Sequence, residues 1–115
     1  MTINSKQKGK RFERELSKMF KSYGYETRRG QQYCGSNGDA DVVGAPGLHI
    51  EAKHQETMRL YDWIAQAKHD AKKDLVPAVF HRKNNHEVLV TMTFPDFMKL
   101  YAAYERELWE NGRKG

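Results

Sequence analysis

The sequence predicts one α/β domain with elements in the order α-β-β-β-α-β-β-α. Three observations indicate this class. Apolar residues recur every three or four positions in three long segments, they alternate or cluster in the short runs between, and no repeat or linker interrupts the chain. A length of 115 residues suits a compact domain with a single core, and we assign residues 1–115 to it. We expect a mixed central sheet of about five strands flanked by helices.

The first predicted helix begins at Ser5 and ends at Tyr23. Its apolar residues form one stripe, and Gly24 follows as the C-terminal cap. The stripe consists of Phe12, Leu16, Met19, Phe20 and Tyr23. Basic residues crowd the beginning of this helix, namely Lys6, Lys8, Lys10, Arg11 and Arg14. The helix dipole favours anions at that end, so either the cost is tolerated or an anionic partner binds there.

Three short strands are predicted next, over residues 25–29, 40–44 and 48–54. A glycine-rich polar loop at 30–38 separates the first two strands. Asp39 is interpreted as a loop or turn residue, because the residues around it favour turns. Residues of the third strand alternate strictly between the two faces of the sheet. Leu48, Ile50 and Ala52 face one side, whereas His49, Glu51 and Lys53 face the other.

The second half of the chain predicts a helix over 58–73, strands over 76–82 and 87–92, and a last helix. The buried stripe of the helix at 58–73 is expected at Leu60, Ile64, Ala67 and Ala71. Thr93, with Asp96 three residues later, resembles a capping box and predicts the start of the last helix. That helix carries Phe97, Leu100, Tyr101, Tyr104 and Leu108, and we expect residues 110–115 to be a frayed tail.

Charge and cysteine content limit the classes of function. The net charge is +5 and the isoelectric point about 9.4, which favours a polyanionic partner. Cys34 is the sole cysteine, which excludes an internal disulfide and a four-cysteine zinc site. No apolar stretch is long enough to span a bilayer, and the first residues lack the apolar region of a signal peptide. We therefore expect a soluble cytoplasmic protein.

Charged residues interrupt the two apolar runs between residues 38 and 54. Glu51 and Lys53 leave one face of their strand about 7 Å apart, and Asp41 lies on the preceding strand beyond a tight turn. If these strands pair, two carboxylates converge beside a lysine. Two close carboxylates repel, and a divalent cation such as Mg²⁺ or Mn²⁺ relieves the repulsion and also binds phosphate oxygens. The alternative is a solvated ion pair on an exposed sheet face.

These residues carry a resemblance to a known family. The order of a helix with an acidic residue, an aspartate, and Glu-x-Lys followed by a helix resembles the PD-(D/E)xK nuclease superfamily. The stretches KGKRFERELSKMF, DVVG and HIEAK, with the later QAKHDAKKDLVPAVFHRKNNHEVLVTM, resemble archaeal-type Holliday junction resolvases and their phage relatives. The resemblance covers nearly the whole chain. It implies a restriction-endonuclease-like fold, DNA as the substrate, and hydrolysis of phosphodiester bonds in four-way junctions by a magnesium-dependent homodimer, with manganese as a substitute.

The resemblance also implies roles for particular residues. Asp41 and Glu51 would hold the metal, and Lys53 would be the catalytic lysine. Glu13 matches the acidic residue of the first helix, a third catalytic residue and metal ligand, although helical geometry alone does not separate it from Glu15. The sequence departs from the motif at Ala40, which replaces the proline, and in a longer loop that leaves open whether Arg28 or Arg29 binds phosphate.

Further residues are candidates for binding or support. The candidate DNA contacts are Lys8, Lys10, Arg11, Arg14, Arg28, Arg29, Arg82 and Lys83, and Gln66 is a candidate supporting residue. His49 and His54 could touch DNA, although ordinary polar strand residues are the favoured interpretation. The aromatic residues Tyr61, Trp63, Tyr104 and Trp109 are interpreted as core or as a subunit interface. Two alternatives stay open: another nicking, repair or replication nuclease of this fold, and a DNA-binding domain without catalysis.

Overall fold

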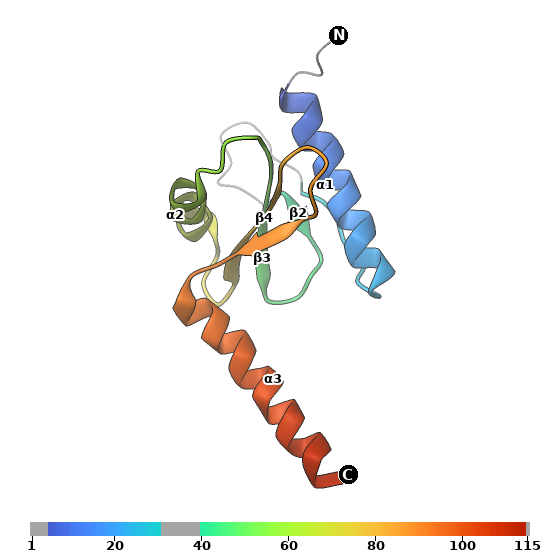
Figure 1. The fold of residues 1–115 in the computed structure, drawn as a ribbon, viewed down its shortest axis with the longest axis vertical. Coiled ribbons are helices and arrows are strands. Elements are labelled where there is room, and N and C mark those ends of the chain that lie inside the picture. The colour runs from blue at the N-terminus through green and yellow to red at the C-terminus, as the bar shows by residue number, and fades with distance from the viewer. Residues whose placement is uncertain (1–4, 31–39, 115) are drawn as a thin grey trace.

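The computed structural model describes residues 5–30 and 40–114 and has the predicted order of elements (Figure 1). Most of the predicted loop at 30–38, together with Cys34 and Asp39, lies outside the described residues. The elements are α1 (Ser5–Ser22), β1 (Arg28–Arg29), β2 (Val42–Val43), β3 (Leu48–His54), α2 (Leu60–Asp70), β4 (Val76–Arg82), β5 (Leu89–Thr91) and α3 (Phe94–Lys114). Within the described residues, no helix has both the length and the apolar character needed to cross a bilayer.

The strands form the predicted mixed sheet of five strands, in the order β1-β2-β3-β4-β5. Its centre is the parallel pair β3–β4, in which Glu51 is opposite Val79 and Lys53 is opposite His81. The other neighbouring strands pair antiparallel. A parallel pair needs a long crossover connection, and α2 supplies it. The fold is therefore α/β with a restriction-endonuclease-like arrangement.

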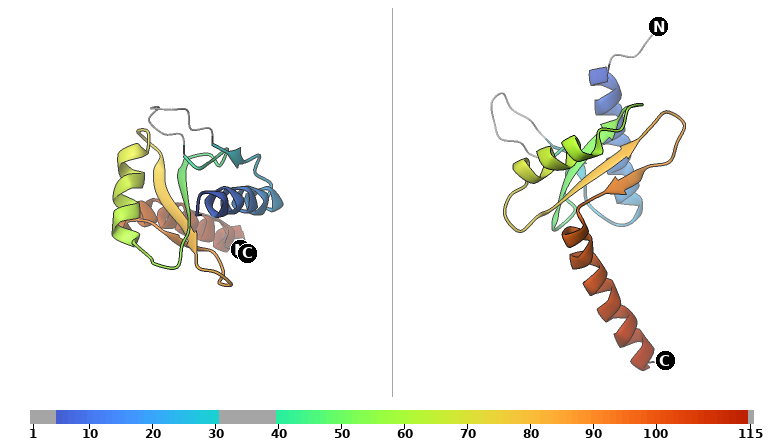
Figure 2. Two further views of the ribbon diagram at one scale, coloured as in Figure 1. Left: turned by 90° about the horizontal axis from the view of Figure 1, so that it is seen from above. Right: turned by 60° about the vertical axis from the view of Figure 1, so that its left-hand side comes forward.

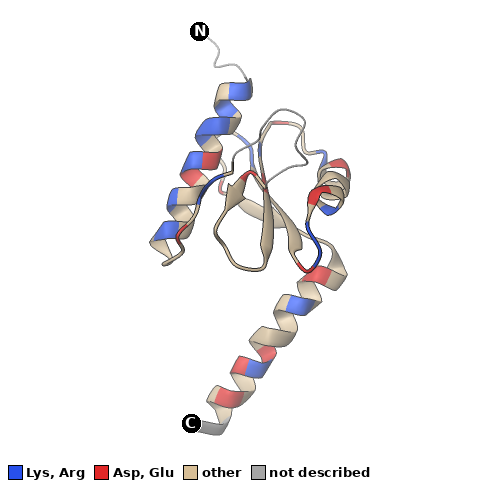
Figure 3. Ribbon diagram, turned by 180° about the vertical axis from the view of Figure 1, so that it is seen from behind, with Lys and Arg blue, Asp and Glu red and all other residues tan. Residues whose placement is uncertain are grey.

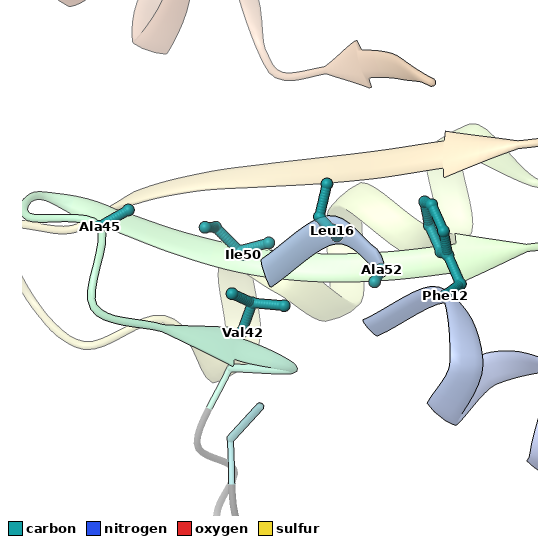
Figure 4. Close-up of a cluster of buried hydrophobic side chains, with 6 residues drawn as sticks. All are labelled: Phe12, Leu16, Val42, Ala45, Ile50 and Ala52. Atoms are coloured by element: carbon teal, nitrogen blue, oxygen red, sulfur yellow. The ribbon is translucent and has the colours of Figure 1, made fainter. Parts of the chain in front are cut away.

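Helices α1 and α2 cover opposite faces of the sheet (Figure 2). Phe12 and Leu16 of α1 pack against Val42, Ile50 and Ala52 (Figure 4). On the other face, Trp63 and Ala67 of α2 pack against Val79 of β4. The alternation predicted for β3 is confirmed, because its even-numbered residues face α1. Residues 49, 51 and 53 consequently face α2.

Glycines end two of the outer elements. Gly24 caps α1 with a φ of +96°, as predicted, and its N–H donates to the carbonyl oxygen of Lys21 over 2.9 Å. Gly44 ends β2 with a φ of +108°, and a Cβ at this position would collide with the backbone of Glu26. These constraints help to explain why β1 and β2 are two residues long, shorter than the predicted strands.

Parts of the predicted stripes of α1 and α2 are wrong. Met19 and Tyr23 are 44% and 83% exposed, and Tyr25 packs against Phe20 with 6.4 Å between the ring centroids. In α2, Leu60 and Ile64 pack partly buried against the core as predicted, and Ala67 is buried. The helix ends before Ala71, which has an extended conformation with a ψ of 133°. The interpretation of Trp63 as a core residue is confirmed, whereas Tyr61 is 91% exposed.

The last helix, α3, differs most from prediction. Its capping box is confirmed, since the Asp96 N–H donates to Thr93 Oγ1 and the Thr93 hydroxyl donates to the Asp96 carboxylate. Its apolar stripe does not form a core, because every side chain from Phe97 to Gly112 is exposed. The helix extends away from the sheet and from both other helices (Figures 1 and 2). It is helical to Lys114, whereas a frayed tail was expected over residues 110–115.

Candidate active site

Asp41 and Glu51 lie side by side on the α2 face of the sheet. The Asp41 N–H donates to the Ile50 carbonyl oxygen over 2.8 Å, which extends the β2–β3 pairing by one residue. Because Val42 faces α1, its neighbour Asp41 faces the other side, as Glu51 does. The Ala52 N–H donates to Asp41 Oδ2 over 2.9 Å and fixes the carboxyl group. The backbone thus sets the position of both carboxyl groups.

The environment of Asp41 disfavours its charged form. Burial is the largest cause, and the negative charge of Glu51 is the second; together they raise the pKa of Asp41 from its ordinary 3.8 to about 8. A hydrogen-bonding contact with Glu51 and the charge of Glu13 act in the same direction, and the hydrogen bond from Ala52 opposes them. Without a cation, Asp41 is therefore mostly protonated at neutral pH.

Glu51 has a second neighbour that the sequence interpretation did not assign to it. His49 Nε2 lies 2.8 Å from Glu51 Oε1, and the His49 side chain is only 3% exposed. The two residues are two positions apart on β3, so they share a face. The alternation of the strand placed them on one face, but the contact and the depth of burial required the fold. His49 is thus a partner of the carboxylate, which agrees with its interpretation as a strand residue.

Lys53 lies beside these carboxyl groups in a cleft of about 980 Å³. Residues from α1, β1, β3 and α2 line the cleft, together with Asp41. Within residues 5–30 and 40–114, no ion pair engages the Lys53 ammonium. The amine is therefore available to a ligand in the cleft, which Asp41 and Glu51 also line.

The structure separates the alternatives that the sequence left open on α1 and β1. Glu13 lines the cleft and accepts a hydrogen bond from Arg29 Nε over 3.0 Å. Glu15 instead accepts one from Arg82 Nη1 over 3.4 Å and does not line the cleft. Arg29 also lines the cleft, whereas Arg28, its exposed neighbour on β1, does not. Glu13 and Arg29 therefore occupy the cleft positions.

A family model with the description "Phage putative PDDEXK endonuclease" matches residues 4–111. The chain belongs to this family. The match confirms both the PD-(D/E)xK resemblance and the relation to phage proteins. No curated protein matches the chain significantly.

In this PDDEXK endonuclease, α2 contributes Gln66 and Asp70 to the cleft. Gln66 Nε2 donates to Asp70 Oδ2 over 2.9 Å, and this bond is the main cause that lowers the pKa of Asp70. The sequence interpretation named Gln66 but missed Asp70. A spacing of four residues places both on one side of a helix, and this signal could have found Asp70.

The predicted basic residues fall into two groups. Lys10 lines the cleft, and Arg11, Arg14 and Lys83 are exposed; basic residues mark much of α1 in Figure 3. Lys8 and Arg82 are held by the protein itself. Lys8 Nζ lies 3.9 Å from Glu56, and the Arg82 guanidinium bonds Glu15 and lies 5.9 Å above the Phe12 ring. The first group is the one free to meet a phosphate backbone.

The donor set of the PDDEXK endonuclease fits a magnesium ion held by two protein carboxylates. Within the described residues, no three His, Cys, Asp or Glu side chains are arranged to hold an ion together, and Glu13, the third ligand that the resemblance implies, is bonded to Arg29. Mg²⁺ is commonly bound by one or two carboxylates, with water and substrate phosphate completing its shell. Asp41 and Glu51 provide that pair, and a cation there would relieve the repulsion that raises the pKa of Asp41.

Proposed function

We propose that this endonuclease is a magnesium-dependent Holliday junction resolvase that acts in the host cytoplasm. The observation that carries the proposal is the meeting of Asp41 and Glu51 on one sheet face, with Lys53 beside them in an open cleft. The resemblance of the α1, β2 and β3 segments to archaeal-type resolvases supports four-way junctions as the substrate. The intact set of three residues argues against a DNA-binding domain that has lost catalysis.

Each residue has a chemical task in this proposal. Asp41 and Glu51 hold Mg²⁺, which supplies positive charge to the scissile phosphate and to the attacking water. His49 fixes the orientation of the Glu51 carboxylate through its 2.8 Å contact. Lys53 orients or deprotonates the water and offsets the charge that develops on the phosphate. Arg29, held by Glu13, is the candidate for a neighbouring phosphate, with Gln66 supporting the cleft.

Binding and symmetry follow from the substrate. Exposed basic residues of α1 would contact phosphates without reading sequence, so binding should weaken steeply as salt rises. A four-way junction presents two symmetry-related scissile phosphates, whereas one chain has one such cleft. We therefore propose a two-fold symmetric homodimer.

Substrate preference is the first prediction. The protein should cut a four-way junction with Mg²⁺ or Mn²⁺ and leave it intact with chelator, because the paired carboxylates bind a phosphate only through the cation. A gel assay with junction, duplex, nicked and flap substrates, each with and without metal, measures this. Equal cutting of duplex and junction would favour a general nuclease of this fold. Binding without cutting on any substrate would reject catalysis.

Metal binding should release a proton from Asp41. Because the pKa of Asp41 is about 8, the carboxyl group must lose its proton at pH 7 before it can ligate an ion. Apparent Mg²⁺ affinity should therefore rise by up to about tenfold per pH unit below 8 and level off above it. Calorimetric titration with Mg²⁺ in buffers of different ionisation enthalpy measures the number of protons released for each ion bound. Identical heats in all buffers at pH 7 would contradict this assignment, and Asp41→Asn is the control that should release none.

A further inference from the structure

Helix α3 presents a continuous apolar surface that no described part of the chain covers. Its residues share one half of the helix circumference, and we name them the α3 apolar face: Phe94, Phe97, Met98, Tyr101, Tyr104 and Leu108. Their exposed fractions range from 40% to 74%. Leu100 flanks the face, three residues after Phe97 and four before Tyr104.

A bare helix of this kind lacks its usual source of stability. Isolated helices are marginal in water, and most helical stability in proteins comes from packing an apolar face. Singly scattered apolar residues at a surface are normal, whereas a contiguous apolar patch marks an interaction site. The α3 apolar face is contiguous from Phe94 to Leu108, about four turns of the helix, so we expect a partner to cover it.

Charge indicates what kind of partner fits. Helix α3 contains four acidic and four basic residues, so its net charge is zero. By contrast, α1 is predominantly basic. DNA is therefore a poor partner for α3, because a neutral helix gains little from phosphates. Two copies of a neutral helix with one apolar face meet without net repulsion.

The exposed area matches the requirement of a stable dimer. A large side chain offers roughly 150–250 Å² when fully exposed, and these are about half exposed, so each contributes on the order of 100 Å². With Leu100, the face can remove about 700 Å² from water per copy. A standard interface buries about this area on each partner.

We infer that the α3 apolar face is the interface between two copies of this chain, related by a two-fold axis. The same patch then serves both copies, so Tyr101 and Leu108 of each contribute to one isologous contact. This inference rests on the homodimer of the proposed function, but not on the four-way junction as substrate. None of the described residues that line the cleft belongs to α3, and α3 extends away from the other elements (Figure 1), so both active sites stay open to DNA.

Sedimentation velocity of the full chain without DNA tests the interface. The wild-type chain should sediment as a dimer of twice its 13.4 kDa mass. Tyr101→Glu combined with Leu108→Glu should raise the dissociation constant at least about a hundredfold, because the carboxylates would be buried unpaired. Ala103→Glu, on the opposite side of α3, is the matched control and should remain dimeric. Hydrogen exchange adds a second readout, with α3 amides more protected when the wild-type chain is dimeric.

The outcomes separate this inference from the proposed function. Dimers that persist in the double variant would place the interface elsewhere and overturn the inference alone. Wild-type monomers at all working concentrations would overturn both the interface and the homodimer, whereas junction cleavage would still be judged by the gel assay. Equal dissociation of the Ala103→Glu control would also overturn the inference, because the apolar face would then not be the determinant. Dissociation of the double variant alone, with normal unfolding of the body, supports it.

Discussion

Lys53→Ala is expected to lower the rate of DNA cleavage by at least roughly a hundredfold while DNA binding changes little. The ammonium has no ion-pair partner among the described residues and lies in the cleft beside Glu51. Its charge is therefore free to act on a phosphate whose charge grows during the reaction. In binding, by contrast, Lys53 would be one cation among several on the DNA surface. Single-turnover cleavage and a gel-shift assay with chelator measure the two effects separately.

A matched lysine on α3 provides the control. Lys99→Ala removes the same side chain far from the cleft, at an exposed position where it pairs only with Asp96 over 3.3 Å. Cleavage by this variant should be unchanged, since an exposed surface ion pair contributes little to stability. Normal cleavage by Lys53→Ala would show that its assigned role is wrong. Loss of binding in step with cleavage would instead make Lys53 a DNA contact.

The centre of the fold was predictable because burial on both sides restricts sequence. β3 and β4 have the predicted bounds, since long apolar or alternating runs leave one register that buries their apolar side chains. The side-by-side placement of Asp41 and Glu51 followed from the tight turn between their strands. By contrast, β1 and β2 are only two residues long, and local pattern does not fix their length.

Contacts between distant segments were not predictable from the sequence. Glu13 and Glu15 flank the α1 stripe equally, and only the positions of β1 and β4 decide that the first meets Arg29 and the second meets Arg82. The last helix shows a different limit. An amphipathic pattern indicates that the apolar face of a helix packs against another surface. It does not tell whether that surface belongs to the same chain or to another copy. Tyr104 and Trp109 of α3 were therefore assigned to a core or to a subunit interface, and both are exposed in this chain.

Asp41→Asn should abolish metal-dependent cleavage. An amide is a weaker ligand for Mg²⁺ than a carboxylate, and removing one of two protein carboxylates leaves Glu51 alone to hold the ion. We expect at least roughly a hundredfold loss with Mg²⁺, because the ion and its charge stabilisation are lost together. Asp62→Asn, at an exposed position of α2 outside the cleft, is the control and should cleave normally. Full activity of Asp41→Asn with Mg²⁺ would reject the ligand role.

The same substitution should stabilise the metal-free protein at alkaline pH. Folding raises the pKa of Asp41 from 3.8 to about 8. The protonated carboxyl group therefore contributes to the free energy of unfolding in full below pH 3.8, and this contribution is lost as the pH rises through 8. The wild-type Tm in chelator should thus fall between about pH 4 and 8, whereas the amide of the Asp41→Asn variant has no proton to lose and its Tm should fall less. At a pH of about 8.5 the variant should melt at the higher temperature, and added Mg²⁺ should raise the Tm of the wild type only. Parallel Tm curves for the two proteins would mean that Asp41 is not the buried acid of this site. A substitution that destroys catalysis yet stabilises the fold would indicate that the carboxyl pair is kept for its chemistry and not for stability.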